Sequence, residues 1–252
     1  MSIRILILAG GKGRRMGAEV PKPLVELCGK PILEYVLSSV EASGVDDKPA
    51  VVVGYQPEVM KKFVGSRAEI VMQNEQRGTG HAVMVAEDQL KGVDVVLVSY
   101  GDHALYHPNV YKEIVEKHEA TDAKITMLTT VLPSYDDWHA VYTHFGRILR
   151  DSAGRVEAIR EYKMCSNEER DVLEVNNGMY CFDAKWLWEN IGKLSDDNKK
   201  NEFLLTDMIA IAMEQGYEIQ TTTCPPEQGI GVNNLQEVAL AEEVLCGKGS
   251  GA

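Results

Sequence analysis

Residues 3–13 read IRILILAGGKG, an apolar run that passes directly into a glycine-rich turn. The run is only about six residues long, which is too short for the hydrophobic core of a signal peptide or for a membrane span. It predicts instead a buried first strand over Ile3–Leu8. The glycines that follow allow the backbone to approach a ligand closely.

Beyond this strand, apolar β-branched runs alternate with helical patterns. This alternation predicts an α/β fold: a doubly wound, Rossmann-like, mostly parallel mixed sheet with covering helices. The expected strands of the first half are 50–53, 70–72, 93–99 and 125–131, and the expected helices are 31–42, 56–64, 79–90 and 107–119. The second half is expected to contain a hairpin (146–149 and 156–159), a strand (175–182) and helices at 184–191, 203–215 and 234–245.

The chain of 252 residues has a formal net charge of −12. Such acidity argues against a nucleic-acid partner, because a long phosphate footprint needs a basic surface. A single anionic nucleotide is different, since a few local cations and backbone N–H groups are enough to bind it. Composition therefore leaves small phosphorylated ligands open.

The five cysteines are widely spaced and odd in number, and they contain no C-x-x-C pair: Cys28, Cys165, Cys181, Cys224 and Cys246. We therefore expect neither a disulfide framework nor a zinc site, and a reducing compartment. Together with the short first apolar run, this favours a cytoplasmic protein without a membrane partner. The oligomeric state is left open.

The glycine-rich turn at residues 8–16 suits a triphosphate, because several N–H groups can point into one concavity. Arg15 and Lys22 are the cations that such a ligand requires. The turn is not a Walker A loop, and it lacks the third glycine of a Rossmann dinucleotide fingerprint. Taken alone, it is equally compatible with an ordinary βα connection with solvated basic residues.

The turn is followed by Pro21-Lys22-Pro23, and residues 73–82 read QNEQRGTGHA. With these motifs the chain resembles the sugar-phosphate nucleotidyltransferases, and most closely the uridylyltransferase domain of bacterial N-acetylglucosamine-1-phosphate uridylyltransferases. Six further motifs match in order, at 100–102 (YGD), 146–148 (GRI), 161–163 (EYK), 174–178 (EVNNG), 205–207 (LTD) and 231–234 (GVNN). The resemblance runs from about residue 3 to residue 245.

Departures from the family pattern concern single positions and the end of the chain. Ala104 stands where the family usually has proline, and Arg14 and Arg77 stand where threonine and leucine are common. The bacterial enzymes carry a left-handed β-helix acetyltransferase domain after the position of Leu245, which we expect to be missing here.

The resemblance implies a fold of the nucleotide-diphospho-sugar transferase type, in a single domain over residues 1–246. Residues 1–105 would form its nucleotide-binding half and residues 106–246 its sugar-binding half, with a flexible tail at 247–252. It implies transfer of a nucleotidyl group from an NTP, most simply UTP, to N-acetylglucosamine 1-phosphate, with Mg²⁺ as cofactor and pyrophosphate as second product. Other NTPs (CTP, dTTP), other sugars (glucose, galactosamine), and a non-catalytic nucleotide-sugar-binding regulator remain alternatives.

Site residues follow from the same resemblance. Arg15, Lys22 and Asp102 are the expected catalytic residues, and Asp102 and Asn233 the expected Mg²⁺ ligands, because Mg²⁺ takes one or two protein oxygens beside phosphate and water. The expected nucleotide-binding residues are Leu8, Ala9, Gly10, Gly11, Gly13, Gln73, Gly78, Thr79 and Gly101. The expected sugar-binding residues are Gly146, Glu161, Asn176 and Thr206.

Simpler roles stay open for several of these residues. Asp102 fits a helix N-cap, and Asn233 with its asparagine neighbour fits a turn. Gln73 fits a solvent-facing amide at a strand end. Glu161 fits a surface ion pair with Lys163 or Arg147, and for His81 we expect a packing role rather than that of a general base.

Overall fold

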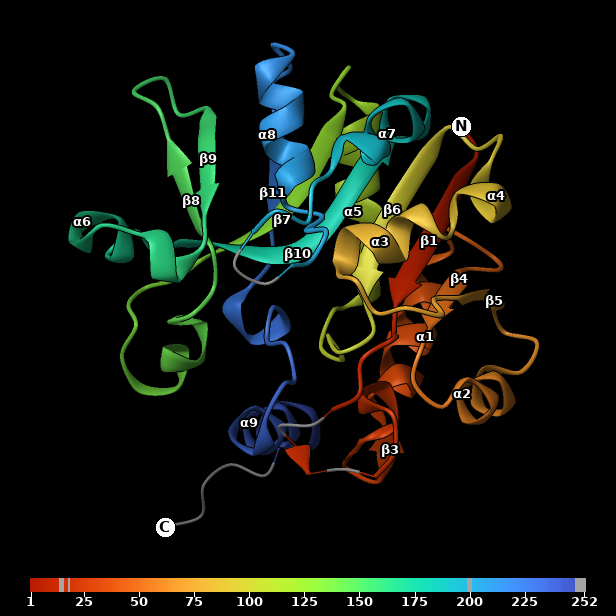
Figure 1. Cartoon of the computed structure of the whole chain (residues 1–252). Coiled ribbons are helices and arrows are strands. Elements are labelled where there is room, and N and C mark those ends of the chain that lie inside the picture. Colours follow the sequence, from red (N-terminus) through yellow and green to blue (C-terminus); the bar gives the residue numbers. More distant parts are fainter. Residues whose placement is uncertain (14–15, 18, 199–200, 248–252) are drawn as a thin grey trace.

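A mixed sheet forms the centre of the molecule in the computed structural model, which describes residues 1–13, 16–17, 19–198 and 201–247 (Figure 1). Within these residues the main sheet has nine strands, seven of them in the order β11-β7-β10-β6-β1-β4-β5, while β8 pairs with β10 and β9 pairs with β8. The strands are β1 (Ile3–Leu8), β4 (Ala50–Val53), β5 (Glu69–Met72), β6 (Val95–Tyr100), β7 (Ile125–Val131), β8 (Arg147–Arg150), β9 (Val156–Arg160), β10 (Glu174–Asp183) and β11 (Gln220–Thr223).

All strands of the seven-strand order except β10 run in the same direction. Strand β1 is parallel to both β4 and β6, β4 is parallel to β5, and β11 is parallel to β7. Strand β10 lies antiparallel between β6 and β7, and thereby joins the two halves of the chain, while β8 pairs antiparallel with β10 and with β9. The predicted α/β, doubly wound, mostly parallel mixed sheet is confirmed.

Side-chain alternation along β1 explains why helices cover both faces. Leu6 packs into one apolar cluster with α3, α4, α7 and α8, whereas Ile5 and Ile7 point into a second cluster with α1, α2 and α5. Because successive residues of a strand face opposite sides, a continuous apolar run requires a cover on each face. The helices are α1 (Ile32–Ser43), α2 (Pro57–Val64), α3 (Thr79–Met84), α4 (Glu87–Leu90), α5 (Pro108–Glu119), α6 (Asn167–Arg170), α7 (Ala184–Asn190), α8 (Asp207–Glu214) and α9 (Leu235–Cys246).

The last helix, α9, lies beside a small hairpin formed by β2 (Glu26–Leu27) and β3 (Lys30–Pro31) (Figure 1). A third apolar cluster holds them together and includes Leu27, Val232 and Ala241. The end of the chain therefore packs against the segment that follows the glycine-rich turn.

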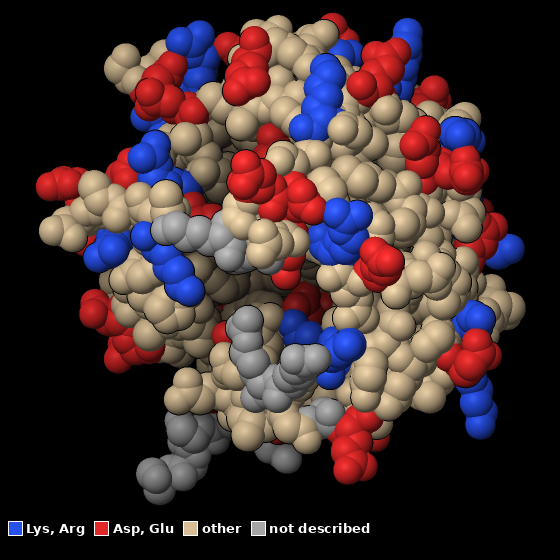
Figure 2. Space-filling model, viewed as in Figure 1, with Lys and Arg blue, Asp and Glu red and all other residues tan. Residues whose placement is uncertain are grey.

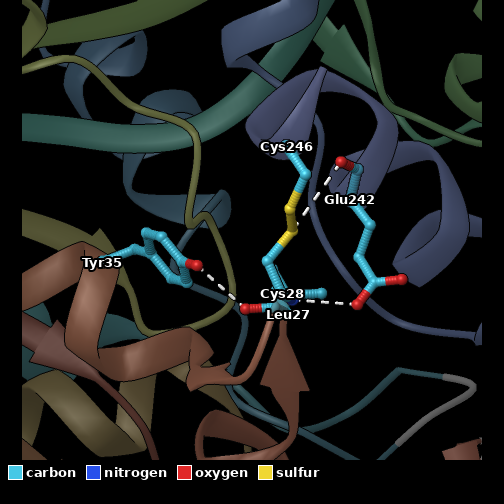
Figure 3. Close-up of a disulfide and its surroundings, with 5 residues drawn as sticks. All are labelled: Leu27, Cys28, Tyr35, Glu242 and Cys246. Atoms are coloured by element: carbon cyan, nitrogen blue, oxygen red, sulfur yellow. Dashed lines mark hydrogen bonds between the residues drawn. A yellow bond between two sulfur atoms is a disulfide. The ribbon is translucent and has the colours of Figure 1, made fainter. Parts of the chain in front are cut away.

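A disulfide reinforces this contact (Figure 3). It joins Cys28 in the hairpin turn to Cys246 at the end of α9, with Cα atoms 6.6 Å apart. The backbone N–H of Cys28 also donates to Glu242 Oε1 at 2.9 Å. The expectation of no disulfide is thus wrong for one pair, because spacing along the chain does not reveal two residues that packing brings together. The other three cysteines are free and buried.

Two predicted helices differ from those observed. The helix expected over 79–90 is divided into α3 and α4, and the helix expected over 203–215 begins only at Asp207. Phe203 is committed elsewhere, since its N–H donates to Arg77 O at 2.8 Å and its carbonyl accepts from Gly80 N–H at 2.8 Å. A segment whose backbone groups bond to a distant loop cannot also form helical hydrogen bonds.

The hairpin β2–β3 and strand β11 were not predicted. Strands β2 and β3 have only two residues each, and β11 (Gln220–Thr223) reads QTTT, which has no apolar residue to mark a strand. Of the predicted flexible tail at 247–252, residues 248–252 lie outside the described part of the chain. No helix among the described residues combines the length and the apolar composition needed to cross a membrane.

Reduction of the Cys28–Cys246 disulfide is expected to destabilise the protein by about 2–4 kcal/mol, because the bond constrains a very long loop in the unfolded chain. For a chain of this size that corresponds to a fall in Tm of roughly 4–16 °C. Differential scanning calorimetry with and without reductant measures it. Cys28→Ser and Cys246→Ser should melt like the reduced protein and ignore the reductant. Free alkylation of both thiols in the unreduced protein would contradict the bond.

Candidate active site

A cavity of about 260 Å³ opens at the carboxyl ends of β1 and β6, the edge of a parallel sheet at which ligands of α/β proteins bind. The face of the molecule in Figure 2 is hollowed near its centre, and both basic and acidic side chains reach the hollow. Ten of the expected site residues line the cavity: Leu8, Ala9, Gly10, Gly11, Lys22, Gln73, Gly78, Thr79, Gly101 and Asp102.

Gly10 and Gly11 of the glycine-rich turn line this cavity. No N–H group of residues 10–13 donates to another residue in the described ranges. The carbonyl of Gly11 instead accepts from Lys22 N–H at 3.2 Å, and Gly13, with a φ of 65°, lies against the Lys22 backbone. Gly13 therefore supports the position of Lys22 and does not line the cavity. Arg15, an expected catalytic residue, lies outside the described residues.

Three segments far apart in the sequence meet at the ammonium group of Lys22. Its Nζ donates to Asp102 Oδ2 in a very close contact and to Asn233 Oδ1 at 2.7 Å. The side chains of Lys22 and Asp102 are only 16% and 18% exposed, so the charges are largely removed from water. Pairing is what makes such burial tolerable.

Asp102 is held in its ionised form. Burial alone would raise its pKa, but the positive charge of Lys22 and the hydrogen bond from His103 outweigh burial, and its pKa lies well below the ordinary value. The backbone carbonyl of Asp102 accepts from Val232 N–H at 2.9 Å, which ties this turn to the segment before α9. Asp102 does not cap a helix, since the N-cap of the next helix is His107.

The consecutive residues Asn233 and Asn234 make different contacts. Asn234 is the N-cap of α9, and its Oδ1 accepts from the N–H groups of Gln236 and Glu237 at 2.9 and 3.0 Å. Asn233 is held by Glu237, which accepts from its backbone N–H, and its side chain points to Lys22. The capped helix thus fixes the direction in which Asn233 presents its amide.

Asp102 and Asn233 have the chemistry of a magnesium site. Oδ2 of the first and Oδ1 of the second converge on one cationic atom, Lys22 Nζ, so the two oxygens are close enough to contact a single cation. Mg²⁺ prefers such oxygen ligands and needs only one or two from the protein. The residues present therefore fit the ion.

Gln73 and Gly78 form one wall of the cavity. Gln73 is almost fully buried, and its Nε2 donates to Gly78 O at 3.2 Å and to His81 Nδ1 at 3.3 Å. In the described part of the chain, nothing donates to Gln73 Oε1 and nothing accepts from Gly78 N–H. The wall therefore offers one acceptor and one donor. His81 thus contacts the amide through a hydrogen bond, a polar contact that the predicted packing role did not include.

Gly78 is a position that only glycine can occupy. Its φ is 106°, and a Cβ there would lie 2.5 Å from Phe203 O. The segment that contains Phe203 also bonds to Thr79, whose Oγ1 accepts from Leu205 N–H at 3.0 Å. Thr79 is thereby held in the lining of the cavity. The segment before α8 packs against Gly78 through Phe203.

The expected sugar-binding residues lie in the second half of the chain, and none of them lines the first cavity. The carbonyl of Gly146 accepts from Asn176 N–H at 2.9 Å, and Asn176 Nδ2 donates to Tyr180 Oη at 2.7 Å. Glu161 and Thr206 line a neighbouring cavity of about 330 Å³ between β9 and α8. The structure thus groups them in two pairs.

Tyr100 connects the two regions. It lines the first cavity, and its pKa is raised by burial and further by the charges of Asp102 and Glu161. Both carboxylates therefore lie within electrostatic range of its ring. Glu161 also adds to the burial that raises the pKa of Tyr180. Asn176, by its hydrogen bond, and Glu161, by its charge, accordingly both lie near Tyr180.

Tyr100, Gln76, Glu202 and His103 were missed by the sequence prediction. Tyr100, Gln76 and Glu202 line the cavity, and Gln76 Nε2 donates to Gly10 O at 2.9 Å. Gln76 and Tyr100 stand inside two of the matched motifs, so their place in those motifs was the available signal. Glu202 and the orientation of His103 had no signal in the sequence pattern.

The chain is similar to known proteins over most of its length. Residues 5–177 match the family model described as MobA-like NTP transferase domain. Curated relatives named bifunctional protein GlmU include those of Clostridium novyi (38% identity), Geobacillus sp. strain WCH70 (39%) and Clostridium acetobutylicum (36%). Each alignment covers 95% of this chain but 51% of the relative. The chain therefore spans about half the length of the curated relatives it matches.

Replacing Lys22 by methionine should strengthen binding of Mn²⁺ to the ligand-free protein, because the competing ammonium is removed from Asp102 and Asn233. A hydrogen bond between charged groups contributes about 1.5–3 kcal/mol, so a gain of roughly tenfold or more is expected. Electron paramagnetic resonance titration of free Mn²⁺ measures it. Lys12→Met is the matched control, since the Lys12 ammonium lies over the Tyr55 ring, 5.8 Å from its centroid. Unchanged or weaker binding by Lys22→Met would refute a shared cation position.

Proposed function

This chain belongs to the family of MobA-like NTP transferase domains, and on that premise we propose that it transfers the uridylyl group of UTP to N-acetylglucosamine 1-phosphate, with release of pyrophosphate. The observation that carries the proposal is the meeting of Lys22, Asp102 and Asn233 beside a glycine turn with free N–H donors. A polyanion and a divalent cation are the two partners that the residues of this arrangement suit.

In the proposed reaction an oxygen of the sugar phosphate forms a bond to the α-phosphorus of UTP. The bond from this phosphorus to the bridging oxygen breaks, and the electron pair leaves with pyrophosphate. No general base is required, because the attacking phosphate is already an anion. Lys22 and the N–H groups of Gly10 and Gly11 stabilise charge on the triphosphate and hold it in line. Mg²⁺, when held by Asp102 and Asn233, supplies further charge neutralisation.

Specificity for uracil is supported by the wall formed by Gln73 and Gly78. Uracil presents an imide N–H between two carbonyls, which matches the acceptor Gln73 Oε1 and the donor Gly78 N–H. Cytosine has an acceptor in place of that N–H and an amino group in place of one carbonyl. It would therefore place like groups against like groups.

The sugar phosphate is assigned to the wall beside Tyr100, with Gly146, Glu161, Asn176 and Thr206 as proposed contacts. A carboxylate accepts from sugar hydroxyls, and an asparagine amide both donates to and accepts from an N-acetyl group. Residues 1–105 and 106–246 then serve as the nucleotide and sugar halves of one unit. A cytoplasmic location stays a proposal, and the Cys28–Cys246 disulfide argues against the reducing compartment from which it was predicted.

A screen of four NTPs against a panel of sugar 1-phosphates, with pyrophosphate release as the readout, tests the assignment. We expect Mg²⁺-dependent release with UTP and N-acetylglucosamine 1-phosphate. Asp102→Ala and the isosteric Asp102→Asn should both lose turnover by about 10²-fold or more while keeping the circular dichroism of the wild type. Another preferred pair would change the substrates, and tight nucleotide-sugar binding without release would indicate a regulator.

Gln73→Ala should lose the preference for UTP over CTP that the wild type shows. Each unpaired polar group in such a site costs about 1–3 kcal/mol, so the wild type should prefer UTP by one to two decades. Competition kinetics with UTP, CTP and dTTP measures the ratio. Gln76→Ala is the matched control, since its amide donates to Gly10 O and should alter the rate without altering the ratio. Equal use of UTP and CTP by the wild type would reject the uridylyl assignment.

A further inference from the structure

His103 directs its imidazole back onto the neighbouring carboxylate. Its Nδ1 lies 2.9 Å from Asp102 Oδ1. Nδ1 must carry the proton in this contact, because an unprotonated nitrogen would set its lone pair against a carboxylate oxygen. Nδ1–H therefore donates to Oδ1, whereas Oδ2 of the same carboxylate faces Lys22. The two oxygens of Asp102 have separate partners.

The imidazole is held from several sides. Its ring stacks on Tyr106 with centroids 5.0 Å apart and planes 7° from parallel, and Tyr106 Oη donates to Asn177 O at 3.0 Å. A Cβ on Gly231 would lie 3.1 Å from two atoms of the imidazole. The side chain of His103 is only 10% exposed. Its orientation is thus set by packing that does not depend on a ligand.

Fixing Oδ1 determines how Asp102 meets a cation. A carboxylate free to rotate offers one oxygen, the other or both, whereas Mg²⁺ requires near-ideal octahedral geometry. With Oδ1 engaged by His103, only Oδ2 remains to face the cation position that it shares with Asn233 Oδ1.

We propose that His103 is a positioning residue that fixes the Asp102 carboxylate so that Oδ2 alone receives the divalent cation. The proposal rests on the proposed function for the identity of the cation, and it concerns this chain's own residues. His103 does not touch substrate. Loss of a group that orients a metal ligand typically costs 10- to 100-fold in metal affinity.

Mn²⁺ titration of the full-length ligand-free protein by electron paramagnetic resonance tests the proposal without reference to turnover. His103→Leu removes the donor and should weaken Mn²⁺ binding by about tenfold or more. His103→Asn loses the same stacking on Tyr106 but places an amide N–H near the former Nδ1, and should stay within about threefold of wild type.

The comparison of the two variants separates positioning from packing. Equal loss of affinity in both, or no loss in either, would overturn the proposal. Wild-type protein that binds no Mn²⁺ would overturn the cation site and the proposal together. The expected pattern in a protein that releases no pyrophosphate with any NTP would leave the positioning role standing and reject the proposed function alone.

Discussion

Every other feature of the site depends on the pairing of one partly buried carboxylate with one ammonium. Asp102 is ionised at a place where burial penalises charge, and Lys22 supplies the opposite charge. For the two to meet, the turn after β1 must return to the end of β6. Asn233 completes the contact, and it reaches the site only because α9 packs against the β2–β3 hairpin. One electrostatic requirement therefore links the beginning, middle and end of the chain.

Much of the fold could be predicted because its main strands are buried on both faces. The bounds of β1, β4 and β7 agree with the predicted 3–8, 50–53 and 125–131, since runs of β-branched residues between polar turns leave few alternatives. The helix expected from 203 was wrong because Phe203 bonds to a loop more than one hundred residues earlier. Local periodicity contains no information about such a partner.

The site was predictable to the extent that motifs mark it. The family motifs located Lys22, Gln73 and Asp102, and these side chains do line one cavity. Motifs did not reveal that Gly13 supports the Lys22 backbone, or that Asn233 and Asn234 separate into a site residue and a helix cap. Those outcomes depend on which way each side chain leaves the backbone, and a single sequence does not encode that direction locally.

The Cys28–Cys246 bond has a consequence for the chain as a polymer. It joins residues 218 positions apart, so almost the whole molecule becomes a covalently closed ring with two short arms. A single cleavage in any surface loop of that ring opens it without releasing a fragment. Lys22 lies shortly before Cys28, outside the ring, and Asn233 lies shortly before Cys246, inside it. The two segments therefore stay covalently connected after such a cut. While the bond is intact, the protein can thus be nicked without being divided.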